Sequence, residues 1–138
     1  MTARYWVRRL DEVPRVPPEE PGDPLWWPLQ HYFGFTAFGV NVYTAPEPGG
    51  ALIGEHDEAE SGQEELYIVT EGAARFTLER EEHVVSALGV VAVPDPATRR
   101  KAVAEEPGTT VIAVGGHRAE PFSSSWQPQH FEGVPRAG

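Results

Sequence analysis

Short apolar runs separated by turn residues dominate the pattern of this chain. Gly and Pro number 14 each, so few stretches are long enough for a helix. Phe38, Val40 and Val42 alternate with Asn41 and Tyr43, which predicts a strand with two different faces. Further strands are expected over residues 51–54, 65–70, 75–78, 83–85, 90–93, 102–104 and 109–114. Strands at this spacing, joined by tight turns, predict an all-β sandwich or barrel.

Two irregular segments flank these strands. Residues 1–35 are expected to hold an N-terminal strand and then an arm, because Pro14 to Pro28 contains six prolines and cannot form a regular element. Trp26 and Trp27 predict that the arm is pinned to the body by aromatic burial or, alternatively, forms a lid over a pocket. Residues 117–138 are expected to form a C-terminal strap. With residues 36–116 as the body, the chain is predicted to be a single domain.

Charge and composition exclude several classes of function. The net charge of −10 disfavours binding to nucleic acid or to anionic membranes. The absence of Cys excludes thiol catalysis and Cys-ligated metal centres. The N-terminus lacks an apolar secretory region, and no apolar run approaches the ~20 residues of a membrane span, so we expect a soluble, cytoplasmic protein. Ser123 to Ser125 lack the Gly-x-Ser-x-Gly setting of a nucleophile.

One pair of motifs resembles a known family. Gly50-x5-His56-x-Glu58, followed by Glu65-x6-Gly72, resembles the first motif of the cupins. Gly89-x4-Pro94-x-Pro96, followed after two residues by Arg99, resembles the second. The resemblance covers roughly residues 36–116 and is similar to small single-domain bacterial cupins (cupin_2-like). It implies a jelly-roll β-barrel.

The resemblance also implies a site inside the barrel, where metal-binding cupins use two His and one Glu from the first motif and one His from the second. In this chain His56 and Glu65 match that pattern, Glu58 stands at the second His position, and Arg99 stands at the second-motif His position. The metal motif is therefore degenerate. An Arg stays protonated and cannot coordinate an ion.

Three interpretations of these residues stay open. Arg99 points to solvent together with Arg100 and Lys101; or Arg99 lies inside the barrel mouth and neutralises Glu58 or Glu65 in place of an ion; or a metal site of His56, Glu58 and Glu65 survives. We expect no resident metal, with Fe, Mn, Zn or Ni as the divalent ions that the surviving site would take.

Two functional classes are consistent with these residues. The first is a small-molecule binding barrel whose cavity holds Tyr67, Arg99, Asn41 and Glu65, with Arg99 as the fork for a small anionic or carbonyl ligand. Glu65 and Tyr67 share one strand face, so both are expected to look into the barrel. The second class is a metal-dependent cupin enzyme, a dioxygenase, isomerase or lyase, using His56, Glu58 and Glu65. In either case the resemblance leads us to expect a homodimer.

Overall fold

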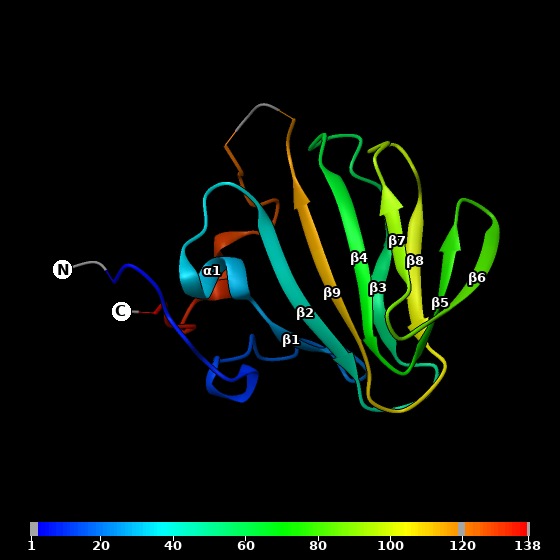
Figure 1. The fold of residues 1–138 in the computed structure, drawn as a ribbon, viewed down its shortest axis with the longest axis horizontal. Helices are drawn as coiled ribbons and strands as arrows, with labels where there is room; N and C mark the ends of the chain where they lie inside the picture. Colours follow the sequence, from blue (N-terminus) through cyan, green and yellow to red (C-terminus); the bar gives the residue numbers. More distant parts are fainter. Residues whose placement is uncertain (1–2, 119–120, 138) are drawn as a thin grey trace.

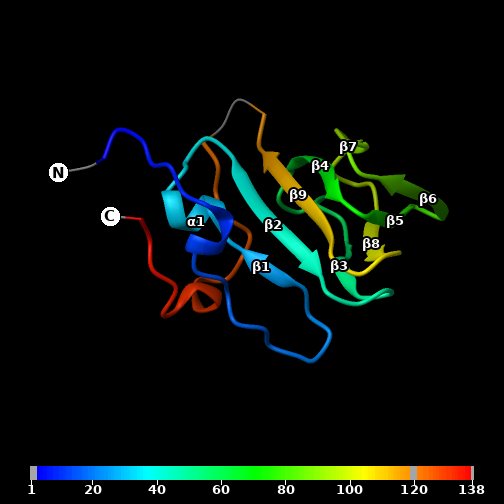
Figure 2. The same cartoon turned by 60° about the horizontal axis from the view of Figure 1, so that its bottom comes forward.

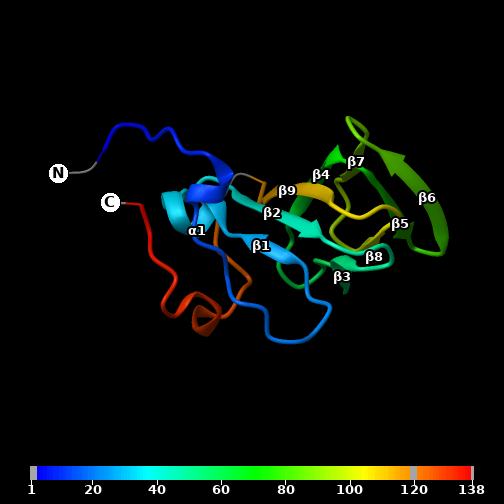
Figure 3. The same cartoon turned by 90° about the horizontal axis from the view of Figure 1, so that it is seen from below.

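Two antiparallel sheets packed face to face make up the body of the molecule. A computed structural model describes residues 3–118 and 121–137. The strands are β1 (Leu25–Trp27), β2 (Gly39–Ala45), β3 (Ala51–His56), β4 (Glu64–Glu71), β5 (Ala73–Leu78), β6 (Glu81–Ser86), β7 (Val90–Val93), β8 (Arg100–Ala104) and β9 (Thr109–Gly116). The first sheet has the order β1-β2-β9-β4-β7 and the second the order β3-β8-β5-β6. Figure 1 shows both sheets, and Figure 3 shows β3 and β8 across from β2 and β9.

The expected all-β jelly roll is confirmed, but the barrel is open. Within the described residues, β3 pairs with β8 alone and β7 with β4 alone, so no strand ladder joins the two sheets. Apolar packing closes the interior instead. Its largest fully buried side chains include Tyr67, Phe76 and Leu52, and Val69 and Val111 are also fully buried. These come from β3, β4, β5 and β9, so both sheets contribute to one core.

The Pro-rich arm contains a strand that its sequence did not predict. β1 fits between Pro24 and Pro28, pairs with β2, and forms an edge of the first sheet, where neighbouring prolines are tolerated. The short helix α1 (Leu29–Phe33) follows and ends at Gly34, whose left-handed φ of 72° suits glycine. The described residues also contain two 3₁₀ turns, Leu10–Glu12 and Pro128–Phe131.

The C-terminal segment lies against the arm, as Figure 2 shows beside β1 and α1. The described residues of the predicted strap, 117–118 and 121–137, contain the second 3₁₀ turn but no strand. The Trp126 ring lies 4.5 Å from the Trp26 ring, and Phe131 meets Trp26 edge-on at 5.7 Å. Aromatic contacts therefore fix the strap over β1. None of the helices in the described part of the chain is long and apolar enough to cross a membrane.

Candidate functional site

A cavity of about 540 Å³ opens between the two sheets and beneath the strap. β2 contributes Asn41 and Tyr43, and β4 contributes Glu65 and Tyr67, so the inward-facing residues of two strands form one wall. Glu65 and Tyr67 share this face because alternate residues of a strand point the same way. β3 of the second sheet lines the cavity with residues 51–56, and the arm and the strap supply further lining residues. Its volume falls within the range of small-molecule sites in proteins.

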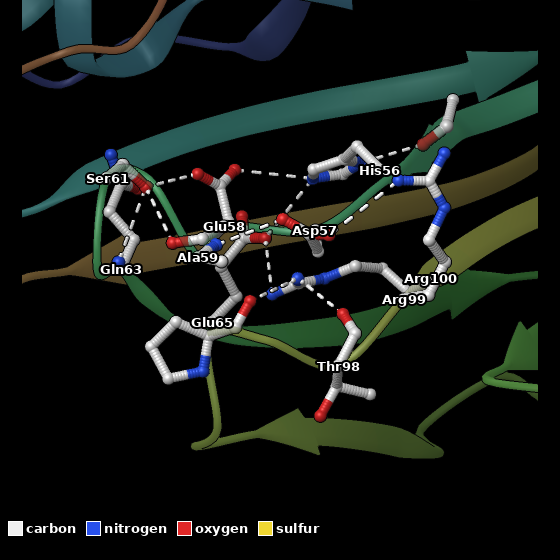
Figure 4. Close-up of polar contacts among 12 residues, drawn as sticks. His56, Asp57, Glu58, Ala59, Ser61, Gln63, Glu65, Thr98, Arg99 and Arg100 are labelled. Carbon is white, nitrogen blue, oxygen red and sulfur yellow. Dashed lines mark hydrogen bonds and ion pairs between the residues drawn. The ribbon is translucent and has the colours of Figure 1, made fainter.

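His56 and two carboxylates form an ionic cluster on the cavity wall (Figure 4). The Nε2 atom of His56, the last residue of β3, lies 3.3 Å from Glu58 Oε1 and 3.6 Å from Glu65 Oε1. The Nδ1 atom lies 2.7 Å from the Gly54 carbonyl oxygen, which only accepts, so Nδ1 donates. The Ser61 hydroxyl donates to Glu58 Oε2. The imidazole ring therefore has a fixed orientation, with Nε2 facing both carboxylates.

Arg100 also belongs to the cluster, through its contact with Glu65. It is the first residue of β8 and the cross-strand partner of His56, and its side chain has no exposed surface. Nη1 donates to the carbonyl of Thr98 at 2.8 Å, and Nη2 lies 3.1 Å from Glu65 Oε1. The same carboxylate oxygen accepts the Tyr67 hydroxyl at 2.7 Å. Glu65 is thus held by an arginine, a tyrosine and a histidine.

The inward arginine is Arg100, whereas Arg99 points to solvent, as one of the three open interpretations had it for Arg99 but not for Arg100. The interpretation in which Arg99 neutralises Glu58 or Glu65 does not hold, because its side chain is 50% exposed and lies 3.6 Å from Glu55 and 3.7 Å from Asp57. Consecutive residues at the start of a strand point in opposite directions, so only one of the two arginines can turn inward. The missed signal is the alternation of Arg100 with Ala102 and Ala104, both of which are buried.

The cluster shifts the proton affinity of its members. Hydrogen bonds to Glu58 and Glu65 raise the pKa of His56 to about 10. Burial acts to raise the pKa of Glu58, but hydrogen bonds from His56 and Ser61 outweigh it and leave that pKa below its usual value. Burial, together with the charge of Glu65, raises the pKa of Tyr67. At neutral pH the cluster therefore pairs two carboxylates with two cations, and Tyr67 stays a hydrogen-bond donor.

Among the described residues, His56, Glu58 and Glu65 are the group that could hold a metal ion. One ligand atom from each lies within 4.8 Å of the others. The buried Arg100 opposes a divalent ion at this position, because its Nη2 lies 3.1 Å from Glu65 Oε1 and its charge competes for that carboxylate. These residues fit an arginine-compensated cluster better than an ion.

Asn41 lines the same cavity as these groups, and its Oδ1 accepts the Trp26 indole N–H at 2.7 Å. Trp26 was expected to anchor the arm, and it lines the cavity together with Trp126, for which the sequence predicted no role at a site. Trp27 points elsewhere, with the Arg15 guanidinium 5.8 Å from its ring. The structure therefore brings five of the six predicted site side chains together at the cluster and the cavity, with Arg99 outside.

Two glycines make room for the site. Gly39 pairs with Gly115 at the ends of β2 and β9. A Cβ atom on Gly39 would lie 2.6 Å from the ring of Phe122, one of the strap residues that line the cavity. A Cβ atom on Gly115 would lie 3.1 Å from Glu65 Cγ. Larger residues at these positions would displace the strap or the central carboxylate.

The fold is shared with solved structures of cupins. No family model matches this chain, and the search of curated proteins found no match. The structure of KdgF from Halomonas sp. has a TM-score of 0.67 and 19% identity, covering 90% of this chain and 97% of that one. A protein from Silicibacter pomeroyi, described as a sugar phosphate isomerase from a cupin superfamily, has a TM-score of 0.64 and 24% identity over 80% and 74% of the two chains. A cupin protein from Bacteroides fragilis has a TM-score of 0.65 and 15% identity over 91% and 93%. Together with the two-sheet jelly roll, these similarities identify the chain as a small domain of the cupin fold.

Proposed function

We propose that this chain binds a small polar molecule in the cavity between its sheets without a resident metal ion. The observation that carries the proposal is that the buried Arg100 forms an ion pair with Glu65 and so occupies a carboxylate that would otherwise be available to an ion. Arg100 supplies a permanent positive charge beside Glu65. Glu58 and Glu65 then act as oriented hydrogen-bond acceptors on the cavity wall.

Because the arginine that turns inward is Arg100 and not Arg99, an anionic ligand is no longer the one we expect. An anionic ligand depended on Arg99 as a fork inside the cavity, but the guanidinium of Arg99 is paired with Glu55 and Asp57 outside it. Arg100 cannot take that role, because its side chain has no exposed surface. The acceptors that remain on the wall favour a ligand that donates hydrogen bonds.

Two measurements on protein purified without a His tag test this proposal. Elemental analysis is expected to find less than about a tenth of an equivalent of iron, manganese, zinc or nickel. A thermal-shift screen with a broad library of small polar molecules is expected to find a ligand that raises the unfolding temperature. Glu65→Gln should weaken binding of that ligand, whereas Arg99→Gln, a change outside the cavity, should preserve it. A stoichiometric metal, or a library without any binder, would contradict the proposal.

A metal-dependent cupin enzyme is the second candidate. Its support is the close approach of His56, Glu58 and Glu65, whose ligand atoms lie within 4.8 Å of one another. In that case the ion would act as a Lewis acid or oxygen carrier for a dioxygenase, isomerase or lyase. Here His56→Ala should remove metal and activity together. Retention of full metal content by His56→Ala would exclude this set of ligands.

We also propose that the chain forms a homodimer through the outer face of the first sheet. Register aligns two apolar rows across this face, Val40, Val114, Leu66 and Ala92 in one, and Val42, Ile112, Ile68 and Val90 in the other. Val42 is buried, but Val90 is 59% exposed and Leu66 is 36% exposed, and an exposed patch of adjacent apolar residues is uncommon in a monomer. Light scattering at micromolar concentration is expected to give twice the mass of the chain, and Val90→Glu the mass of a monomer. A monomeric wild type would reject the proposal.

A further inference from the structure

We infer that Leu88 of each copy of the chain packs into a groove on the outer face of the first sheet of the other copy, so that the homodimer contains two identical contacts. This inference rests on the proposed dimer and names the residues that specify it. It follows from the backbone and exposure of Leu88, from the position of the groove, and from the distribution of charge.

Leu88 is an exposed apolar residue held in a strained conformation. It lies in the turn between β6 and β7, is 87% exposed, and has a φ of 72°, in the left-handed region that bulky residues rarely adopt. Its N–H donates to the Val69 carbonyl at 2.7 Å, and the Gly89 N–H donates to the Ser86 carbonyl at 2.8 Å, so the turn is fixed to β4. Strain at an exposed apolar residue points to a contact with another molecule.

A groove of about 560 Å³ lies on the outer face of the first sheet. Leu10 of the first 3₁₀ turn and Leu29 of α1 contribute to its lining. The other lining residues with side chains are mostly valine, isoleucine and threonine of β2, β9 and the end of β4, namely Val42, Thr44, Thr70, Thr110 and Ile112. The groove therefore offers methyl groups as packing partners for an aliphatic side chain.

Leu88 and the groove occupy matching positions under a two-fold axis. Within the first sheet, β7 forms one edge, and β9 and β4 separate it from β2. Figure 1 shows β2, β9 and β4 side by side. When two outer faces meet, an axis that runs along the strands between β9 and β4 places β7 of one copy over β2 of the other.

The same axis preserves the position along the strands. Leu88 and the groove lie at the same end of the sheet, since Leu88 is bonded to Val69, while the next residues of β4, Thr70 and Glu71, line the groove. The axis that puts β7 over β2 therefore also brings each Leu88 to the groove of the partner. One self-complementary face supplies both halves of the contact.

Little charge opposes this contact. Residues 84–93, which include the turn, contain no charged residue. The described residues that line the groove include a single charged group, the carboxylate of Glu71. Two copies that each carry a net charge of −10 repel one another over most of their surfaces, so they approach best where both are uncharged. A cationic partner would instead be drawn to the acidic surfaces, so the turn and the groove favour a second copy of the chain.

Sedimentation analysis of three single variants of the full chain tests the contact. Leu88→Asn removes the apolar side chain with a residue that suits the left-handed backbone, and Thr70→Trp fills the groove from an exposed position. Each change removes both symmetric contacts, so each should weaken dimerisation by about a hundredfold or more. Val84→Asn is the matched control, because Val84 is 55% exposed but lies on β6 of the second sheet. It should dimerise like the wild type, and circular dichroism should show that all three variants are folded.

A mixture of the two weakened variants tests whether the contact is reciprocal. In a mixed dimer, Leu88 of the Thr70→Trp copy meets the unaltered groove of the Leu88→Asn copy, so one of the two contacts is restored. We expect the mixed dimer to be at least about tenfold tighter than the dimer of either variant alone. A mixed dimer that is no tighter than both of these would overturn the inference.

The remaining outcomes separate this inference from the proposed dimer. Unchanged dimerisation of folded Leu88→Asn protein overturns the inference and leaves the dimer in place. A dimer that is weakened by Thr70→Trp but not by Leu88→Asn has a different segment in the groove, and this result also overturns the inference alone. A wild type that is monomeric at micromolar concentration rejects the inference together with the proposed dimer.

Discussion

Arg99 and Arg100 offer a matched pair of substitutions for testing the electrostatic basis of the site. The two residues are adjacent and chemically identical, but Arg100 is fully buried and Arg99 is half exposed. Replacing each with Met retains much of the side-chain stem and removes the charge. Any difference in stability between Arg100→Met and Arg99→Met therefore reports the environment rather than the residue type.

The expected magnitudes differ by several kcal/mol. Arg100→Met removes the hydrogen bond to the Thr98 carbonyl and the 3.1 Å ion pair with Glu65. Breaking a buried ion pair from one side costs about 3–5 kcal/mol. Because Glu65 keeps His56 and Tyr67 as partners, we expect a loss near the lower limit, about 3 kcal/mol. Arg99→Met removes only exposed ion pairs and should cost below about 1 kcal/mol.

Urea denaturation followed by tryptophan fluorescence measures both values. With a slope of about 2 kcal/mol/M, a loss of about 3 kcal/mol lowers the midpoint by about 1.5 M. A double-mutant cycle with Glu65→Gln should show that Arg100→Met costs less once the carboxylate is gone. A difference between the two Met variants of less than about 0.5 kcal/mol, or a cycle without coupling, would refute the assigned role of Arg100.

Three further predictions concern metal, pH and the strap. Arg100→His should bind Zn²⁺ in calorimetry where the wild type does not, because an imidazole replaces the competing cation beside Glu65. Equal heats of Zn²⁺ binding for the variant and the wild type would contradict this. The pKa of His56 is raised to about 10, so the free energy of folding that its protonation contributes is fully present below pH 6.5 and is lost as the pH rises to 10. His56→Gln should therefore be less stable than wild type at about pH 6 and approach its stability at about pH 10.5. A difference in stability that stays constant with pH would contradict this. Gly39→Ala should speed hydrogen exchange in the strap by displacing Phe122, while Gly54→Ala, where a Cβ meets open space, should not.

The strands could be predicted from the chain because their signals are local. The alternating residues of β4 and β9 and the turn residues between strands specify backbone conformation within a few positions. The same alternation correctly put Glu65 and Tyr67 on one face. The resemblance of the motif with His56, Glu58 and Glu65 to the cupins predicted a shared site, and the structure brings these three residues into one cluster.

Other features depend on contacts between distant parts of the chain. β1 forms because β2 offers it an edge, which no property of its three residues and flanking prolines revealed. The strap owes its position to Trp26 and Phe131, more than a hundred residues apart, and to the room left by Gly39. The open sheets likewise follow from long-range pairing, which local patterns do not specify.

The choice between Arg99 and Arg100 shows where sequence and tertiary structure divide. The sequence by itself determined that two adjacent arginines stand where the resemblance to the cupins places a metal ligand, and that a histidine and two glutamates stand in the other motif. Only the pairing of β8 with β3 decided which arginine turns inward, since His56 lies opposite Arg100. A shift of one residue in a strand exchanges its two faces, so the register of that pair determines which charge is buried beside Glu65 and which remains in water.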